Sequence, residues 1–288
     1  FTASVPPGST FKMISALGLL EAGEMTADTP VECPGTYTVQ GRTFTNADGF
    51  ALGTVPFRTA FARSCNTTFA ALAPRLGPDG LRRAAASVGI GTAWEIGTPV
   101  VTGSVGANES TVEAAAAAFG QGTTLVSPLS LAAATAAVAR GAWIAPTLFP
   151  DGPPGADPSP ESPSDQGASA EESGSTDPDA PSEEDTPRGG PPAPPADGTP
   201  LPSAAVAALQ VMMREVVTAG TATALANVPG GPVYAKTGTA EFTDNPADTH
   251  AWTIGWQGDI AFAVFVENGG GSAETAVPIV EAFLRALA

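Results

Sequence analysis

Apolar residues recur at helical spacing in several separate runs of the chain. The first run, Ser9 to Leu20, follows Pro6-Pro7-Gly8, which cannot easily continue a regular element. Two further runs, Val55 to Arg63 and Thr67 to Leu76, lie on either side of a short polar triplet. The pattern therefore predicts two junctions at which polar side chains project from the end of a helix.

Nearer the C-terminus the pattern alternates as it does in strands. Val233 to Glu241 reads as a strand with a glycine inside it, and Ala251 to Trp256 alternates in the same way. The alanine-rich runs Val112 to Phe119 and Leu131 to Ala139 are interrupted before the roughly 20 apolar residues that a membrane-spanning helix needs. A chain of 288 residues can bury a substantial core.

Residues 150–202 differ from the rest in composition. They hold twelve acidic residues against one basic residue, Arg188, and 15 of the 29 prolines. The segment contributes −11 to the formal net charge of −17. Low hydrophobicity with high charge predicts a disordered, solvated spacer, with partner binding as the alternative. The chain has no basic patch, which argues against nucleic acid as a ligand.

Lysine occurs only twice, at Lys12 and Lys236, whereas arginine occurs ten times. Arginine stays protonated in proteins, but burial and neighbouring charge can make a lysine neutral. Both lysines lie in short motifs, which suggests one proton acceptor and one compact cation. These two roles are typical of acyl-transfer enzymes with a serine nucleophile.

The first motif is Ser9-Thr10-Phe11-Lys12. Ser9 and Lys12 are three residues apart and so share one face of a helix. The partial positive charge of a helix N-terminus favours an alkoxide on Ser9 and disfavours an ammonium on Lys12. A neutral Lys12 could then accept the Ser9 proton. The ordinary alternative for so short a motif is a capping serine followed by a solvent-exposed lysine.

Two further motifs add to this pattern. Ser64-Cys65-Asn66 lies between two helical runs, where side chains can point into a cleft, although Ser and Asn are also common caps. Lys236-Thr237-Gly238-Thr239 lies in the predicted strand, and its glycine suggests close approach by a backbone or a ligand. Strand alternation places Lys236 and Thr237 on opposite faces, so both can line one site only if the edge of the sheet twists.

The order Ser-x-x-Lys, Ser-x-Asn, Lys-Thr-Gly is that of the penicillin-recognising serine enzymes. The chain resembles the transpeptidase domain of a penicillin-binding protein over roughly residues 1–149 and 201–288. Outside the three motifs, the segments that carry the likeness are Val5 to Gly8, Phe119 to Gly122, Val126 to Ala132, Met213 to Ala222 and residues 250–268.

This resemblance implies an α+β fold, with an antiparallel sheet flanked by helices and a helical subdomain. It also implies that strands before the nucleophile segment are missing from the chain. The expected organisation has a first part of the transpeptidase domain at 1–149, the acidic insertion at 150–202, and a second part at 203–288. The second part holds the Lys-Thr-Gly strand, a hairpin and a C-terminal helix.

The resemblance also implies a role for each motif residue. Ser9 would attack the D-Ala-D-Ala carbonyl of a peptidoglycan stem peptide, or a β-lactam. Lys12 would be the general base, and Ser64 would pass the proton to the leaving amine. Backbone N–H groups of Ser9 and Thr239 would form the oxyanion hole. Substrate binding would fall to Asn66, Lys236, Thr237, Gly238 and Thr239.

The chain has an even number of cysteines, Cys33 and Cys65. The family that it resembles works outside the cytoplasm, where disulfides persist. A bond between them is expected, and it would hold Ser64 and Asn66 at a fixed distance from the nucleophile. Two buried, unbonded thiols remain the alternative, because the sequence says nothing of the distance between them.

No cofactor is expected, and one histidine with two cysteines is too few for a usual zinc site. His250 is interpreted as a structural or surface residue at the start of a strand, and Trp252 and Trp256 as sheet packing. The expected partners are stem peptides, β-lactams and wall-synthesis or divisome proteins. The expected location is outside the cytoplasm, with an N-terminal tether to the cytoplasmic membrane that this sequence does not include.

Two other functions share the serine and lysine motifs. A β-lactamase would need a deacylation base, and the Glu-x-x-Leu-Asn signature of one class is absent. Another class prefers an apolar residue where Asn66 stands. A non-catalytic β-lactam sensor would be acylated and would signal through a further segment. The rate at which a penicillin adduct is lost separates the first alternative from a transpeptidase, which holds the adduct.

Overall fold

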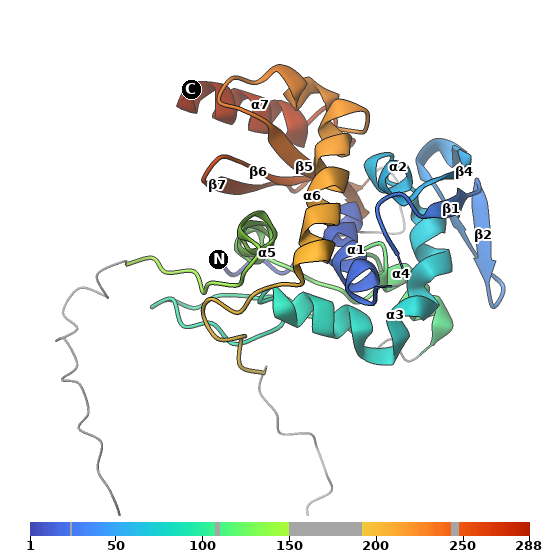
Figure 1. Ribbon diagram of the computed structural model, residues 1–288, viewed down its shortest axis with the longest axis horizontal. Coiled ribbons are helices and arrows are strands. Elements are labelled where there is room, and N and C mark those ends of the chain that lie inside the picture. The colour runs from blue at the N-terminus through green and yellow to red at the C-terminus, as the bar shows by residue number, and fades with distance from the viewer. Residues whose placement is uncertain (24, 107–109, 150–191, 243–247) are drawn as a thin grey trace, which may run out of the picture.

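The computed structural model describes residues 1–23, 25–106, 110–149, 192–242 and 248–288. It has an α+β fold in which an antiparallel sheet stands beside a mostly helical part (Figure 1). The α-helices of the described chain are α1 (Lys12–Glu21), α2 (Phe57–Ala62), α3 (Asn66–Ser87), α4 (Thr111–Ala117), α5 (Pro128–Arg140), α6 (Ser203–Thr218) and α7 (Ala276–Leu287). Three 3₁₀ turns are η1 (Gly8–Phe11), η2 (Ala47–Gly49) and η3 (Thr223–Asn227).

The larger sheet has the strand order β5-β6-β7 and is antiparallel throughout. Its strands are β5 (Val233–Glu241), β6 (Thr249–Gln257) and β7 (Ile260–Val266). Helix α7 covers one face, and α5 and α6 cover the other (Figure 1). Strand β5 forms one edge of this sheet and contacts η1, so the predicted Lys-Thr-Gly strand lies against the predicted nucleophile turn.

Helix α1 runs through the middle of the molecule and packs against α3 and α6. Most of its residues are apolar, and eight of its ten residues are buried. A helix that is hydrophobic all round is a core helix. This burial carries Lys12, the first residue of α1, into the interior.

The segment before α2 forms two small two-stranded sheets, which lie beside α2 and α3 (Figure 1). Their strands are β1 (Pro30–Cys33), β2 (Thr36–Val39), β3 (Arg42–Thr45) and β4 (Gly53–Pro56). β1 pairs with β4, and β2 pairs with β3.

Helix α3 is longer than the sequence pattern predicts. The predicted run ends at Leu76, but the structure continues to Ser87 after a kink at Gly77, where φ is 66° and ψ is −179°. The next residue is Pro78, whose ring fixes its own φ in the helical range and disfavours helical geometry in the residue before it. The Gly-Pro pair therefore bends the helix without ending it.

The acidic segment lies only partly in the described chain, because residues 150–191 fall outside it. Residues 192–202 are held against the domain. Asp197 Oδ1 accepts from the Ala145 N–H at 2.7 Å, Gly198 N–H donates to the Trp143 carbonyl at 2.8 Å, and Leu201 is buried. The expected disorder up to residue 202 is therefore wrong for these last residues. Their composition is polar, but hydrogen bonds to an ordered loop fix them.

Among the helices in the described ranges, none combines the length and the apolar character that crossing a membrane requires.

Candidate active site

The three sequence motifs meet where the start of α1 faces the α2–α3 junction and strand β5. Ser9 lies in η1, and Lys12 begins α1. Lys12 Nζ lies 2.7 Å from Ser9 Oγ. Lys236 Nζ lies 3.0 Å from Ser64 Oγ, although these two residues are 172 positions apart in the chain. The fold thus brings both lysines and both serines into one cluster.

Two glycines allow the nucleophile turn to lie against β5. Gly8 has φ of 51°, and a Cβ there would lie 2.4 Å from the Thr239 carbonyl oxygen. A Cβ at Gly238 would lie 2.8 Å from the Thr10 backbone nitrogen. Both distances are too short for a real side chain, so the backbones approach as closely as glycine permits. The close approach expected at Gly238 is therefore present, and its partner is the nucleophile turn.

Lys12 Nζ lies within hydrogen-bonding distance of four oxygen atoms. Two of them can only accept: the Ser64 carbonyl oxygen at 2.9 Å and Asn66 Oδ1 at 2.6 Å. The other two are hydroxyl oxygens, Ser9 Oγ at 2.7 Å and Ser64 Oγ at 3.1 Å. A neutral amine has two N–H groups and one lone pair. The two obligatory acceptors can therefore take both N–H groups and leave the lone pair for a hydroxyl proton.

The surroundings of Lys12 favour this neutral form. Its side chain is fully buried, and the rings of Phe69 and Phe119 lie 5.7 and 5.9 Å from Nζ. Burial, and after it the nearby charge of Lys236, holds the pKa of Lys12 well below its ordinary value.

Lys236 is buried too, and burial lowers its pKa to about 7. Its Nζ donates to Ser64 Oγ at 3.0 Å and to the Thr237 carbonyl oxygen at 2.9 Å. These are two acceptors for the three N–H groups of an ammonium. An anion arriving at this amine would stabilise its charged form and raise its pKa.

Ser64 connects the two amines, because its Oγ lies 3.1 Å from Lys12 Nζ and 3.0 Å from Lys236 Nζ. Its backbone is left-handed, with φ of 60°, which is uncommon for a residue with a side chain. The Ser64 N–H donates to the Phe61 carbonyl oxygen at 2.9 Å and holds this turn to the end of α2. Such local strain persists only where the surroundings hold the residue in place.

A disulfide joins Cys65, in the middle of the second motif, to Cys33 at the end of β1. The Cα atoms are 6.2 Å apart, which is within the usual range for a bridge. The pairing expected from the sequence is thus present in the structure, and it ties the α2–α3 junction to the small β1–β4 sheet.

Lys236 and Thr237 have different partners, as neighbouring residues of a strand are expected to have. Lys236 faces the α2–α3 junction, while the Thr237 hydroxyl lies 2.5 Å from the hydroxyl of Thr221, just after α6. Thr237 is 3% exposed, and Thr239, two residues further along β5, is exposed. The sequence analysis gave Thr221 no role of its own and named it only as part of the segment Met213 to Ala222, which resembles the family.

Asn66 is oriented by a residue that no sequence pattern singled out. Its Nδ2 donates to the Thr45 carbonyl oxygen at 2.9 Å, while its Oδ1 faces Lys12. Thr45 ends β3 and belongs to none of the motifs. Such a backbone contact depends on the fold and carries no signature in side-chain type.

The comparisons with known proteins agree with this geometry. The family model described as "Penicillin binding protein transpeptidase domain" matches residues 1–285.

The chain belongs to the penicillin-binding protein transpeptidase family.

Relatives support this membership along nearly the whole chain. The "Peptidoglycan D,D-transpeptidase PbpA" of Mycolicibacterium smegmatis is 30% identical over 285 residues, which are 92% of this chain and 50% of the relative. The solved structure of Pseudomonas aeruginosa PBP2 in complex with WCK 5153 is 26% identical, with a TM-score of 0.74. The match covers 99% of this chain and 61% of the PBP2 chain.

The ceftriaxone acyl-enzyme complex of Mycobacterium tuberculosis penicillin-binding protein A shares the fold. Its TM-score is 0.74 at 24% identity, with 99% of this chain and 61% of that chain covered. The chain spans no more than half the length of the curated relatives that it matches.

Other conspicuous residues of this transpeptidase domain are structural. His250 is 5% exposed, its Nδ1 lies 2.6 Å from the Glu267 carbonyl oxygen, and its ring stacks on Phe242. Trp252 Nε1 donates to the Pro6 carbonyl oxygen at 3.0 Å, and Trp256 stacks on Tyr234. Within the described ranges, no three His, Cys, Asp or Glu side chains gather as a metal site would require.

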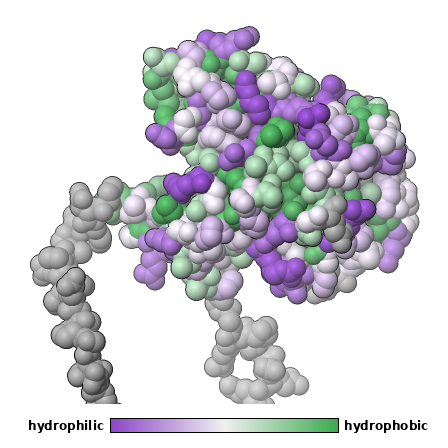
Figure 2. Space-filling model, viewed as in Figure 1, coloured by the Kyte–Doolittle hydropathy of each residue, from purple (hydrophilic) through white to green (hydrophobic). Residues whose placement is uncertain are grey.

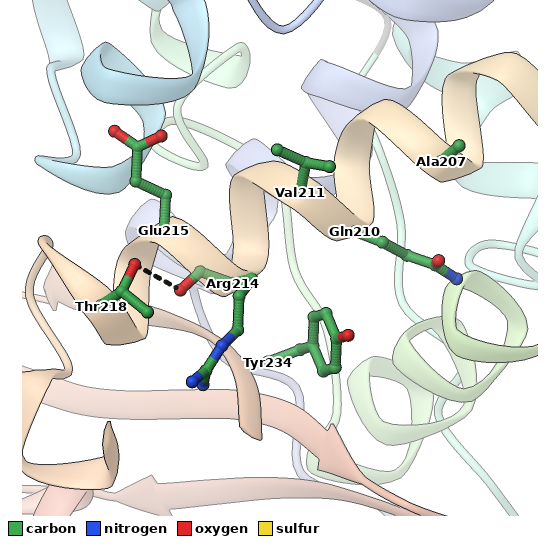
Figure 3. Close-up of a pocket in the computed structure, with 7 residues that line it drawn as sticks. All are labelled: Ala207, Gln210, Val211, Arg214, Glu215, Thr218 and Tyr234. Carbon is green, nitrogen blue, oxygen red and sulfur yellow. Dashed lines mark hydrogen bonds between the residues drawn. The ribbon is translucent and has the colours of Figure 1, made fainter. Parts of the chain in front are cut away.

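A surface hollow of about 410 Å³ lies against α6 and the start of β5 (Figure 3). Its lining comes from the outer side of α6 and from the start of β5, and none of the motif side chains contributes to it. Val211, one of the lining residues, is 50% exposed (Figure 3). The face of the molecule seen in Figure 2 mixes hydrophobic and hydrophilic residues.

Proposed function

We propose that this domain is a peptidoglycan D,D-transpeptidase that cross-links stem peptides through an acyl-enzyme on Ser9. The observation that carries the proposal is the position of Lys12 Nζ, 2.7 Å from Ser9 Oγ, in surroundings that favour a neutral amine. Membership of the family and the names of the curated relatives support it.

Acylation begins when Ser9 Oγ attacks the carbonyl carbon of the penultimate D-alanine. The Ser9 proton passes to the lone pair of Lys12, and the carbonyl oxygen takes the negative charge. The backbone N–H groups of Ser9 and Thr239 bind this oxyanion in the proposal, a role in which one donor contributes roughly 3 kcal/mol. The contact between η1 and β5 supports this pairing of donors.

The tetrahedral intermediate then loses the terminal D-alanine. The C–N bond breaks, and the leaving nitrogen needs a proton. Lys12 returns the proton through Ser64, whose Oγ lies 3.1 Å from Lys12 Nζ. Lys236, at 3.0 Å from the same Oγ, keeps this hydroxyl hydrogen-bonded as the proton moves.

Substrate binding uses the other motif residues. The terminal carboxylate of the stem peptide, or the carboxylate of a β-lactam, binds Lys236 and the hydroxyl of Thr237 at the edge of β5, an arrangement that requires this edge to twist. Gly238 keeps that edge close to the nucleophile turn, and Asn66 Nδ2, which has a second N–H beside the one given to Thr45, binds the substrate amide. A buried cation that meets a carboxylate in this way forms a charge-assisted hydrogen bond.

An amine of a neighbouring stem peptide completes the reaction. It attacks the acyl carbon, gives its proton back along the path through Lys12, and releases Ser9. Water in place of the amine would give a D,D-carboxypeptidase side activity. β-Lactams acylate Ser9 in the same way but leave an adduct that the acceptor amine does not remove.

Peptidoglycan lies outside the cytoplasmic membrane, so we place the domain there, tethered to that membrane by an N-terminal segment outside this sequence. Cross-linking has to follow the extension of glycan strands. Wall-synthesis or divisome proteins are therefore the partners that this activity calls for.

Labelling with a fluorescent penicillin tests the proposal. We expect one covalent adduct on Ser9 with a half-life of hours, and none in Ser9→Ala, while the control Ser203→Ala at the exposed start of α6 labels normally. Rapid loss of the adduct with repeated turnover would instead identify a β-lactamase. A stable adduct with no exchange of D-alanine for an added D-amino acid or acceptor amine would identify a sensor.

A further inference from the structure

Two neighbouring residues outside the three motifs hold the start of α3. Thr45 and Asn46 follow one another at the end of β3. The Thr45 carbonyl oxygen accepts from Asn66 Nδ2 at 2.9 Å, and Asn46 Oδ1 accepts from the Thr67 N–H at 3.1 Å. These two residues, about 20 positions earlier in the chain, therefore bind the side chain of Asn66 and the backbone of Thr67.

Asn46 supplies a capping hydrogen bond that the N-cap residue of α3 does not make. The N-cap residue of α3 is Cys65, and its side chain makes no capping hydrogen bond, since its sulfur is bonded to Cys33. The first N–H groups of a helix lack partners within the helix, and an N-cap side chain normally supplies one. Asn46 supplies this acceptor from another part of the chain.

The Asn46 amide is itself fixed in one orientation. The residue is 3% exposed, and its Nδ2 donates to the Pro34 carbonyl oxygen at 2.9 Å and to the Phe50 carbonyl oxygen at 2.8 Å. A half-turn of the amide would place Oδ1 against both carbonyl oxygens and Nδ2 against the Thr67 N–H. All three contacts therefore select the same orientation.

We propose that Asn46 is a positioning residue for the substrate-binding amide of Asn66. By fixing the first turn of α3 and the carbonyl of Thr45, Asn46 sets the Asn66 amide so that Oδ1 faces Lys12. The Nδ2 group then faces the cleft side with its second N–H. This inference rests on the proposed function, in which Asn66 binds the amide of the substrate.

The role predicts a loss that depends on the structure of the β-lactam. Benzylpenicillin carries an acylamino side chain, whereas 6-aminopenicillanic acid shares its bicyclic core and carboxylate but lacks that amide. If Asn46 acts through Asn66, its removal weakens only the contact that benzylpenicillin has in addition. A general loosening of the fold would affect both compounds alike.

The experiment measures the second-order acylation rate constant for both compounds in the wild type and in variants of the same chain. The ratio to compare is the rate constant for benzylpenicillin divided by that for 6-aminopenicillanic acid. We expect Asn46→Ala to lower this ratio about tenfold, the effect of one hydrogen bond. Asn66→Ala should lower it at least as much. The matched control is Thr92→Val, because Thr92 is also buried in a loop and hydrogen-bonded to a backbone carbonyl. It should lower the melting temperature and leave the ratio unchanged.

Asn46→Asp serves as a second variant if Asn46→Ala does not fold. It keeps an acceptor for the Thr67 N–H but places a carboxylate oxygen against the Pro34 and Phe50 carbonyl oxygens, so the ratio should fall at least as far as in the alanine variant. If both variants fold and both keep the wild-type ratio, the inference is overturned. If only Asn46→Asp folds, a wild-type ratio in that variant alone overturns it. Failure of the wild type to react with either compound would instead overturn the proposed function.

Discussion

At the scale of single residues, the proposed chemistry depends on two buried amines whose surroundings differ. Burial lowers the pKa of both, and the charge of Lys236 lowers that of Lys12 further. The oxygen atoms around Lys12 match the hydrogen-bonding pattern of a neutral amine, with two obligatory acceptors and two hydroxyls. This difference between the two environments supports the proposal that Lys12 is the base and Lys236 the cation.

Replacing each lysine by arginine tests that assignment. Arginine keeps the charge but cannot be deprotonated. Lys12→Arg should therefore lower penicillin acylation by about a thousandfold, which is within the usual contribution of a general base. Lys236→Arg should keep measurable activity, because one cation replaces another. Stopped-flow or gel-based labelling gives both rates, and acylation of Lys12→Arg at near the wild-type rate would refute the role of Lys12.

The same assignment fixes the pH dependence of acylation by a carboxylate-bearing β-lactam. The rate constant for free enzyme and free penicillin should rise as Lys12 loses its proton with increasing pH. It should fall again above a pH of about 7, where Lys236 becomes neutral. In Lys236→Arg the descending limb should vanish, because arginine stays charged. An identical descending limb in both proteins would show that another group causes it.

At the scale of elements, the site is the meeting of a turn, a helix junction and a sheet edge. Glycine backbones let η1 lie against β5, and the disulfide ties the α2–α3 junction to β1. Hydroxyls of Thr67 and Thr68 lie 3.2 and 3.0 Å from the Cys65 sulfur, so the junction is also held by polar contacts. The disulfide and these threonine contacts together hold Cys65, and so the neighbouring left-handed Ser64, in place.

Removing the disulfide should affect stability more than chemistry. The bridge spans a sequence separation of 32, for which the chain-entropy model gives roughly 3–4 kcal/mol of stabilisation. We expect the double variant Cys33→Ser, Cys65→Ser to melt at a clearly lower temperature and to be acylated severalfold more slowly. The wild type with reductant should behave in the same way, while reductant should not affect the double variant. Equal melting temperature and rate with and without reductant would contradict a role for the bridge.

At the scale of the whole molecule, the acidic segment interrupts one domain between α5 and α6 without dividing it. Its last residues, 192–202, bond to the loop at Trp143 and Ala145, and Ala93 N–H donates to the Pro192 carbonyl oxygen at 2.8 Å. The two flanking parts belong to a single core, since α6 packs against α1, α2 and β5.

Two deletions distinguish the packed end of this segment from the rest. Removing residues 152–190 should leave the melting temperature and penicillin acylation nearly unchanged, because loop length has only a weak effect on stability. Removing 152–198 also takes away the contacts of Asp197 and Gly198, and should lower the melting temperature by several degrees. Differential scanning calorimetry measures both. Equal destabilisation by the two deletions would show that the segment before residue 191 contributes as well.

The sequence by itself determined the motifs, the elements that carry them and the disulfide partners that were expected. Strand Val233–Glu241 has the predicted bounds, and the helix after Ser9 lies where the apolar run begins, one 3₁₀ turn later than expected. These features are local: they depend on spacing, on proline and glycine, and on which residue types repeat. The rarity of lysine was informative because a buried amine cannot be replaced by arginine without changing its chemistry.

Only the tertiary structure decided which atoms meet. Thr45 and Asn46 orient Asn66 and the start of α3, and Thr221 pairs with Thr237, yet none of these contacts follows from a motif. The packed residues 192–202 were missed for the same reason, because their polar composition resembles that of the segment before them. Apart from the Thr221–Thr237 pair of hydroxyls, each of these contacts uses a backbone group at one end or both. Backbone groups leave no pattern in residue type, since every residue carries the same carbonyl and nearly every one the same N–H.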